Sequence, residues 1–397
     1  MAKICMVAYT HYITDSRVRR EAEALANRGD VVDFISLGYG EKVVVEQVNQ
    51  VRLIKIPVSR YRGASAMRYI FSYLQFFLRV SVLLAKLHLK NRYQVIQVHT
   101  MPDFMVFVAI FPKFLGAKVI LDVHDLMPEL YQSKFGYTDS HLLIRFITWM
   151  ERSSIRFADY AIAVHKPHLD ALCRHGNPPS KFIVLLNLPD MKVLEYGGGN
   201  SYTNTEPGFE LIYHGTISER HGLEVAIHAV SILKEKIQGL RLKIIGDGDD
   251  VQRLMRLIDE LDLRDFVKIK QGMVPLNELV GEIRCADVGV IPLLYDDFTK
   301  FMLPVKLLEY VALNIPVICS RTETIEAYFD DSMIQYSFPG SVTELADNIE
   351  NLYLNPKRMI ELKINASRFN ANYSWEKQKR IYYELIDNLV ENRKNII

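Results

Sequence analysis

The residues best suited to chemistry lie in one segment, from Leu303 to Ile318. Lys306 and Glu309 stand three residues apart, which places an ammonium and a carboxylate on neighbouring turns at the start of an expected helix. Pro304 is expected at the first helical position, and the apolar runs on both sides predict buried strands. Free backbone N–H groups at such a helix start favour a diphosphate, Lys306 adds charge, and Glu309 can accept both hydroxyls of a ribose. The alternative is an ordinary αβ unit with a solvated Glu309.

Two glycine-containing loops could contribute to the same binding site. In the loop that follows His214, Gly215 permits close backbone approach, and Arg220 stands where a guanidinium can reach a phosphate with two hydrogen bonds. The second loop, Gly246 to Asp249, lacks the full G-x-G-x-x-G spacing, so NAD binding is not expected. Neither loop carries the lysine pattern of a P-loop, which argues against an NTPase.

Polar residues also end several expected strands of the first half. His99, His124 and Asp125 fall at such ends, and with Glu129 they would suit hydrogen bonding to a polyol. The alternative for His99 is a capped loop residue without function. The spacing of histidines and carboxylates predicts no compact metal site.

The loop before the first expected helix holds His11 and Asp15, with Arg17 at the helix start. The interpretation that competes with binding is that Asp15 or Ser16 only caps the helix.

Strands and helices alternate through both halves, which predicts two doubly wound, Rossmann-like α/β domains facing across a cleft. We expect an N-terminal domain over residues 1–190, a polar linker over 191–208 and a C-terminal domain over 209–374. A terminal amphipathic helix, residues 375–397, is expected to complete the first domain.

Bulk properties narrow the classes of function. Forty-eight basic and 47 acidic residues leave a net charge of +1, which argues against a nucleic-acid partner. The four cysteines are scattered without C-x-x-C spacing and are interpreted as reduced core thiols. The first residues form a strand pattern rather than a signal peptide, so a cytoplasmic protein is expected.

One stretch has an unusual charge. From Gln47 to Pro102 there is no Asp or Glu among 56 residues, while nine basic residues lie between Arg52 and Arg92. The stretch includes a long apolar segment that Arg79 and Lys86 interrupt, which disfavours a membrane-spanning helix. We expect residues 52–92 to include a peripheral docking surface for an anionic membrane, and the alternative is a long core helix with basic ends.

Several motifs together resemble the GT-B glycosyltransferases, specifically the large retaining family four, over nearly the whole chain. The matching motifs are Asp15-Ser16-Arg17-Val18-x-x-Glu21-Ala22, His124-Asp125-x-x-Pro128-Glu129, His214-Gly215-Thr216 with Arg220-x-Gly222, Gly246-x-Gly248 and Pro304-x-Lys306-x-x-Glu309-Tyr310. The resemblance implies a nucleotide-diphosphate sugar donor held by the second half and a saccharide or lipid-linked saccharide acceptor held by the first. It also implies retention of configuration, no metal or other cofactor, and a place in cell-surface polysaccharide synthesis.

The resemblance also implies roles for individual residues. The expected catalytic residues are His124, Arg220 and Lys306. The expected donor-binding residues are Gly215, Thr216, Arg220, Gly246, Met273, Val305, Lys306 and Glu309. The expected acceptor-binding residues are His11, Asp15, Arg17, His99 and Asp125.

The sequence departs from the family pattern in the donor half. Phe301 stands where many members carry a glutamate near the transferred sugar, Thr216 replaces a common basic residue, and His221 replaces the usual lysine before Gly222. We interpret Arg220 as taking over the phosphate contact. Two alternatives stay open, a sugar-nucleotide epimerase of the same fold and a catalytically silent nucleotide-sugar-binding subunit, and Phe301 and Thr216 favour the silent subunit.

Overall fold

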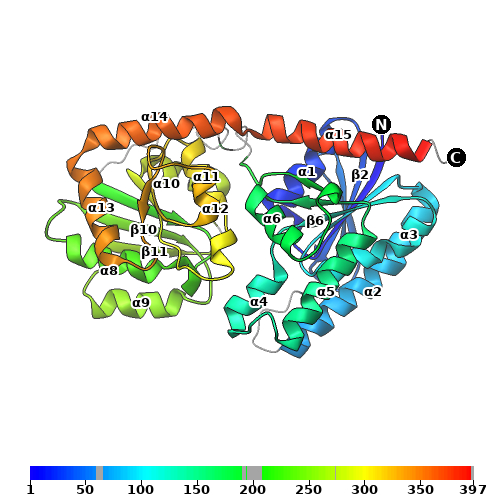
Figure 1. Cartoon of the computed structure of the whole chain (residues 1–397), viewed down its shortest axis with the longest axis horizontal. Coiled ribbons are helices and arrows are strands. Elements are labelled where there is room, and N and C mark those ends of the chain that lie inside the picture. The colour runs from blue at the N-terminus through cyan, green and yellow to red at the C-terminus, as the bar shows by residue number, and fades with distance from the viewer. Residues whose placement is uncertain (60–65, 190–193, 195–207, 273, 395–397) are drawn as a thin grey trace. The chain divides into compact units, whose positions relative to one another are not determined.

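The chain divides into two compact units, each built on one mainly parallel sheet. The computed structural model describes residues 1–59, 66–189, 194, 208–272 and 274–394. Unit 1 comprises Met1–Asn187 and Glu376–Ile397, and unit 2 comprises Leu188–Trp375. The predicted pair of Rossmann-like α/β domains is confirmed (Figure 1). The predicted linker lies outside the described residues except for positions 194 and 208.

Unit 1 contains an eight-stranded sheet in the order β3-β4-β2-β1-β5-β6-β7-β8. Only β3 pairs antiparallel, to β4. Its strands are β1 Lys3–Ala8, β2 Val31–Gly38, β3 Val44–Val48, β4 Val51–Pro57, β5 Val95–His99, β6 Lys118–Val123, β7 Tyr160–Ala163 and β8 Phe182–Val184. The sequence pattern did not single out the β3–β4 hairpin, whose strand β3 is half exposed and therefore lacks a continuous apolar run.

The helices of unit 1 cover both faces of this sheet. They are α1 Ser16–Asn27, α2 Ala66–Asn91, α3 Ile110–Phe114, α4 Met127–Phe135, α5 Leu142–Phe157, α6 Lys166–Arg174 and α15 Trp375–Lys394, with the 3-10 turns η1 Tyr12–Thr14, η2 Asp103–Ala109 and η3 Pro179–Lys181. The single helix expected near Asp103–Phe114 is thus divided into η2 and the short α3. In Figure 1, α1 and α15 lie on one side of the sheet, and α2 and α5 lie on the other.

The C-terminal helix α15 is fastened to unit 1 by side chains along its length. Tyr382 donates to Gln97 Oε1 at 2.5 Å, Gln378 Oε1 accepts from the backbone of Leu186 at 3.0 Å, and Asp387 pairs with Arg28 at 3.0 Å. Helix α15 thus returns the end of the chain to the unit in which it began.

Unit 2 contains a six-stranded parallel sheet in the order β11-β10-β9-β12-β13-β14. Its strands are β9 Phe209–His214, β10 Leu240–Gly246, β11 Val267–Gln271, β12 Val288–Ile291, β13 Val317–Ser320 and β14 Gln335–Ser337. Its helices are α8 Leu223–Leu233, α9 Val251–Glu260, α10 Leu276–Cys285, α11 Val305–Ala312, α12 Glu323–Glu326, α13 Val342–Leu354 and α14 Pro356–Asn372, with the 3-10 turns η4 Glu219–His221 and η5 Thr299–Phe301.

Helix α11 is seated on the sheet through an aromatic ring and a glycine. Tyr310 is fully buried, and its hydroxyl donates to the Ile212 carbonyl at 3.2 Å. A β-carbon at Gly289 of β12 would lie 2.5 Å from the Tyr310 ring, so only glycine leaves room for the ring there.

Replacing Gly289 with alanine should therefore lower the free energy of unfolding of unit 2 by about 1–3 kcal/mol, because the ring or the strand must move. Urea unfolding measures the loss. In the double variant with Tyr310→Leu the added methyl group has room, so the loss should be smaller than the sum of the two single losses. Strictly additive losses would show that Gly289 does not act through Tyr310.

Candidate functional site

Two loops at the carboxyl edge of the unit 2 sheet run against each other through glycines. Strands β9 and β10 are paired so that His214 lies beside Ile245, and the backbone of Gly215 donates to the Ile245 carbonyl at 2.9 Å. A β-carbon at Gly246 would lie 1.9 Å from the Gly215 carbonyl oxygen, and one at Gly248 would lie 1.8 Å from that of Ile217. The glycines are therefore required for the loops to lie in contact, and Gly215 is left exposed with φ +111°.

The Lys306 ammonium lies directly beside Gly215. A β-carbon at Gly215 would be 3.4 Å from Lys306 Nζ, so the absence of a side chain leaves the ammonium beside bare backbone. Nζ donates to the Tyr213 hydroxyl at 2.8 Å and lies 4.1 Å from the centre of the Tyr213 ring. Burial lowers the pKa of Lys306 to about 7, although Glu309 favours the charged form. An anion in contact with Nζ would restore the charge.

Glu309 stands one turn further along α11 beside a buried histidine. His214 Nε2 lies 3.2 Å from Glu309 Oε2, and the pKa of His214 is lowered to about 3 by burial and by Lys306. The imidazole is thus neutral at pH 7, and this contact is not an ion pair. Nε2 is buried and has no hydrogen-bond partner among the described residues.

Arg220 belongs to the short turn η4 that follows the glycine loop. Its guanidinium is half-buried and lies over the Phe298 ring at 5.4 Å. Burial and the charges of Lys306 and Arg220 lower the pKa of the neighbouring His221 to about 3. Since His221 is neutral and bonded to Ser218 Oγ at 3.0 Å, it does not supply the charge of the lysine that the family usually carries there.

The remaining residues predicted to bind the donor differ in their exposure and position. Thr216 is exposed, and its carbonyl accepts from the Tyr213 hydroxyl at 2.6 Å. Val305 is half-buried at the first position of α11, and Pro304 precedes the helix rather than opening it, because its ψ of 127° is extended. Met273 lies outside the described residues. Phe301, the departure from the family pattern, is half-buried at the end of η5.

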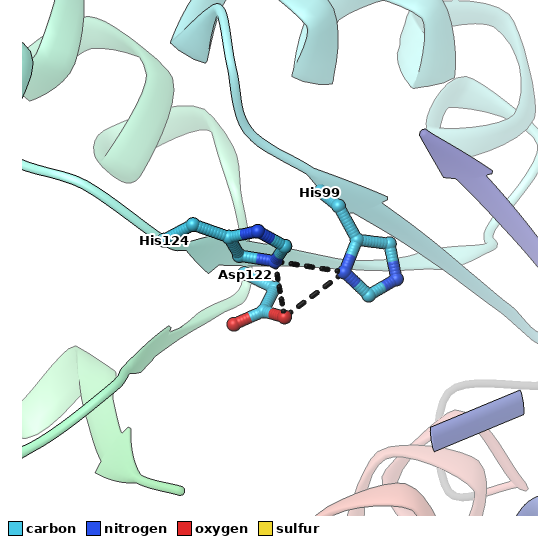
Figure 2. Close-up of side chains that lie close together, drawn as sticks. All are labelled: His99, Asp122 and His124. Atoms are coloured by element: carbon cyan, nitrogen blue, oxygen red, sulfur yellow. Dashed lines mark hydrogen bonds and ion pairs between the residues drawn. The ribbon is translucent and has the colours of Figure 1, made fainter. Parts of the chain in front are cut away.

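Unit 1 brings two histidines and a carboxylate together at the ends of β5 and β6 (Figure 2). His99 lies opposite Asp122 in the register of the paired strands. Asp122 Oδ2 lies 2.9 Å from His99 Nδ1 and 2.9 Å from His124 Nε2, and the two ring nitrogens are 3.2 Å apart. In Figure 2 the second ring nitrogen of His124 points away from both partners. His124 thus has one nitrogen held and one turned outward.

Arg17 is the positive partner of this cluster. Its Nε and Nη2 donate to the two oxygens of Asp122 at 2.9 and 2.7 Å, and Nη1 donates to the Leu185 carbonyl at 3.0 Å. Burial alone would raise the pKa of Asp122, but Arg17 and His124 hold it well below its ordinary value. Burial opposes the charge of His124, and the Asp122 carboxylate outweighs it and raises the pKa of that imidazole.

The same three side chains have ligand atoms close enough to hold a metal ion, which the sequence spacing did not predict. The Arg17 fork disfavours this use, because it engages both carboxylate oxygens and would place a guanidinium beside a divalent cation. The three side chains are therefore better suited to a hydrogen-bonded network than to a metal centre.

The predicted acceptor residues fall into two groups. Arg17 and His99 are buried beneath His124, where they position it rather than face solvent. His11, Asp15 and Asp125 are half-buried at the carboxyl edge of the sheet. His11 stacks on the Tyr39 ring at 4.5 Å, and Asp15 caps α1 by accepting from the backbone of Val18 at 3.4 Å.

Glu129, which we expected beside His124 as a polyol ligand, is instead buried. It bonds to His175 Nε2 at 3.0 Å. Glu151 holds the other nitrogen of His175 at 3.0 Å, and despite burial the two carboxylates raise the pKa of that imidazole to about 10. The expectation was wrong because Glu129 lies within the first turn of α4, whose packing turns it inward.

The sequence analysis missed Asp122 and Tyr213, and it placed His214 in a motif without giving it a role. Asp122 was hidden in an apolar strand, although its spacing of two from His124 places both on one face of the strand. Tyr213 and His214 read as the end of a buried strand, and only the packing of α11 reveals their contacts with Lys306 and Glu309.

Two family descriptions match the chain, one for each unit. Residues 201–369 match the family described as glycosyl transferases group 1, and residues 14–187 match the glycosyl transferase 4-like domain. Together the matches cover most of both units.

Relatives of known name match shorter stretches. WcaL of Escherichia coli strain K12, named as a colanic acid biosynthesis glycosyltransferase, is 36% identical over 110 residues, which are 28% of this chain and 27% of WcaL. The amylovoran biosynthesis glycosyltransferase AmsK of Erwinia amylovora is 32% identical over 124 residues, 31% of this chain and 30% of AmsK. Each match thus spans less than a third of the relative.

Solved structures resemble the whole chain. Sucrose-phosphate synthase from Thermosynechococcus elongatus has a TM-score of 0.78 at 17% identity, with 99% of this chain and 100% of that chain covered. Anabaena HepE in complex with UDP-glucose has a TM-score of 0.72 at 14% identity, with 98% and 100% covered. At these identities the likeness establishes the shared fold, which is the predicted GT-B fold.

The low pKa of Lys306 predicts an unusual titration. In the ligand-free protein the amine should lose its proton around pH 7, so its acylation rate should reach half its maximum near that pH. The exposed Lys357 serves as the comparison within the same protein. Mass spectrometry after brief acylation over a pH series measures both residues in one sample. Equal midpoints for the two lysines would contradict the enclosed position of Lys306.

Replacing Asp122 with asparagine should leave the buried Arg17 with Glu21, 3.3 Å away, as its remaining acidic neighbour, and should lower the free energy of unfolding by about 3–5 kcal/mol. The pKa of His124 should fall, because the carboxylate that raises it is gone. In the native protein the charge of His124 stabilises the fold below its unfolded pKa near 6.5, and this stabilisation is lost as the pH rises through the folded pKa.

Urea unfolding and histidine NMR over a pH series measure both effects. Asp139→Asn, an exposed carboxylate bonded to Gln132, is the matched control and should change neither. An unchanged His124 titration in the Asp122 variant would contradict the proposed coupling.

Proposed function

Because the chain belongs to the glycosyl transferases group 1, we propose that it moves a sugar from a nucleotide-diphosphate sugar to a saccharide or lipid-linked saccharide in the synthesis of a cell-surface polysaccharide. The observation that carries the proposal is the position of Lys306 beside bare backbone at Gly215, with Glu309 one turn along the same helix. The names of WcaL and AmsK support the polysaccharide part.

The donor would lie at the carboxyl edge of the unit 2 sheet. A diphosphate at the start of α11 would contact the first backbone N–H groups of the helix, which no side chain caps. Lys306 would contact the same diphosphate where its ammonium lies beside Gly215, and Arg220 would contact it from η4. Glu309 would then accept the two hydroxyls of the ribose, with the neutral His214 3.2 Å from its carboxylate.

Charge compensation of the leaving group is the proposed source of catalysis. The departing nucleoside diphosphate gains negative charge, and fixed cations nearby stabilise that charge without reorganisation. Lys306 is suited to this role because an anion raises its pKa from about 7, so the ammonium forms as the donor binds. We propose that Lys306 and Arg220 provide this compensation without a metal ion, and that transfer retains the configuration of the sugar.

We assign acceptor binding to unit 1. His124 is the proposed catalytic residue there, because Asp122 holds one ring nitrogen and raises the pKa of the ring, which leaves the second nitrogen to donate to a sugar hydroxyl. His11, Asp15 and Asp125 are proposed to contact the acceptor, while Arg17 and His99 position His124 through Asp122. We propose that the protein acts in the cytoplasm.

A panel of UDP-, GDP- and ADP-sugars tests the donor site by calorimetry and by donor turnover with and without saccharide acceptors. The structure of HepE with UDP-glucose makes UDP-glucose the first ligand to try. Glu309→Gln should weaken binding of the matching nucleotide, and Lys306→Met or Arg220→Met should each lower turnover roughly 10²–10³-fold.

Lys357→Met and Glu361→Gln change the same residue types on the exposed surface of α14 and should leave binding and turnover unchanged. Isomerisation of the donor without any acceptor would identify an epimerase instead. Binding without any turnover would favour a silent subunit, and no binding to any nucleotide sugar would overturn the proposal.

A further inference from the structure

Helix α2 presents an apolar stripe to solvent along most of its length. Phe71 is 69% exposed and Leu78 is 63% exposed. The exposed apolar residues follow one face of the helix, mostly at spacings of three or four residues, and are Met67, Ile70, Phe71, Leu74, Leu78, Val82 and Leu89. Large apolar side chains gathered in this way on a soluble surface indicate a site of interaction.

The opposite face of α2 is packed on unit 1. Phe76, Val80 and Leu84 are fully buried, and Tyr9 at the end of β1 contacts the Phe76 ring at 5.2 Å. Arg79 donates to the Pro57 carbonyl at 2.6 Å. By length and composition alone Met67–Asn91 qualifies as a membrane-crossing helix, but a helix fastened to its domain along one face suits a position in the plane of an interface.

Two neighbouring helices enlarge the apolar surface. Helix α2 contacts α3 and η2, and α5 contacts the same η2, so the three helices lie along one side of unit 1 (Figure 1). Helix α3 adds Phe114, which is 87% exposed. Helix α5 adds Phe146 and Trp149, whose rings lie 5.8 Å apart and are both more than half exposed.

The charge of these helices favours an anionic partner for the apolar surface. Their sequences contain eight basic residues and one acidic residue, Glu151, which is buried and bonded to His175. Six of the basic residues are exposed, namely Arg68, Arg79, Lys86, Lys90, Arg145 and Arg156. By contrast, Arg52 and Lys55 of the predicted stretch pair with Asp33 and Glu46, and Arg60 and Arg62 lie outside the described residues.

We propose that α2, α3 and α5 form one docking surface for an anionic lipid bilayer, with the α2 stripe and the aromatic rings in the interface and the basic side chains at the headgroups. Apolar burial and attraction to anionic headgroups reinforce each other at such a surface. This inference goes beyond the proposed transfer and does not depend on it. It also adds α3 and α5 to the surface that the sequence placed within residues 52–92.

Flotation with phosphatidylcholine vesicles, with and without phosphatidylglycerol, tests the proposal on the full chain. The native protein should float with the anionic vesicles and much less with the neutral ones. Phe71→Gln and Leu78→Gln should each lower the partition coefficient about tenfold. Replacing Lys86 and Lys90 by glutamine should lower it roughly 30-fold on anionic vesicles only.

Ile360→Gln and Ile364→Gln are the matched controls, since they remove exposed isoleucines from α14 of unit 2 and should not affect flotation. Binding of nucleotide sugars by the α2 variants should stay at the native level, so a failure of the docking surface can be told from a failure of the donor site. Equal binding to neutral vesicles would overturn the assignment to anionic lipid.

The two tryptophans allow α5 to be tested separately. Trp149 is 57% exposed whereas Trp375 is 6% exposed, so a blue shift of emission on adding anionic vesicles should come from Trp149 and disappear in Trp149→Phe. A protein that floats without this shift would exclude α5 from the surface.

Two further outcomes would replace the proposal. A native dimer without lipid that Phe71→Gln makes monomeric would assign the stripe to a second copy of the chain. Resistance of vesicle-bound protein to alkaline carbonate would show an inserted helix rather than a docked one.

Discussion

Parallel pairing of the strands is the constraint on which both sites depend. A parallel sheet places the carboxyl ends of its strands at one edge, so residues far apart in the chain meet there. Residues 99 and 122 become partners in unit 1 through the register of β5 and β6, and residues 214 and 245 become partners in unit 2 through β9 and β10. A slip of one residue in either pairing would turn these side chains to the other face.

The buried cations of the two units have different hydrogen-bond partners. In unit 1 the Arg17 guanidinium meets both oxygens of Asp122, and the histidines complete the network from within the protein. In unit 2 the Lys306 ammonium has a neutral hydroxyl as its hydrogen-bond partner, and burial lowers its pKa to about 7. A satisfied network rigidifies a site, whereas an enclosed ammonium whose hydrogen-bond partner is a neutral hydroxyl favours the binding of an anion. This difference matches the assignment of positioning to unit 1 and of the anionic donor to unit 2.

Helix α2 carries one apolar stripe that is buried and a second that is exposed. Its buried stripe supplies core packing through Phe76, Val80 and Leu84, while the exposed stripe beside it is as apolar as the core. A helix of a soluble domain ordinarily carries polar residues on its outer face. The outer face of α2 departs from this pattern, and this departure is the basis of the docking surface proposed above.

The two α/β domains, the position of α11 between two strands, and the candidates Lys306, Glu309 and Arg220 could all be predicted from the residues alone. Strand and helix periods are local properties, and glycine and charge in a loop are visible without knowing what they touch. The contacts of Arg17 and His99 with Asp122, the turn of Glu129 toward His175, and the central place of Asp122 in the cluster became visible in the folded chain. Those outcomes depend on strand register and on the packing of helices from distant parts of the chain, which local patterns do not encode.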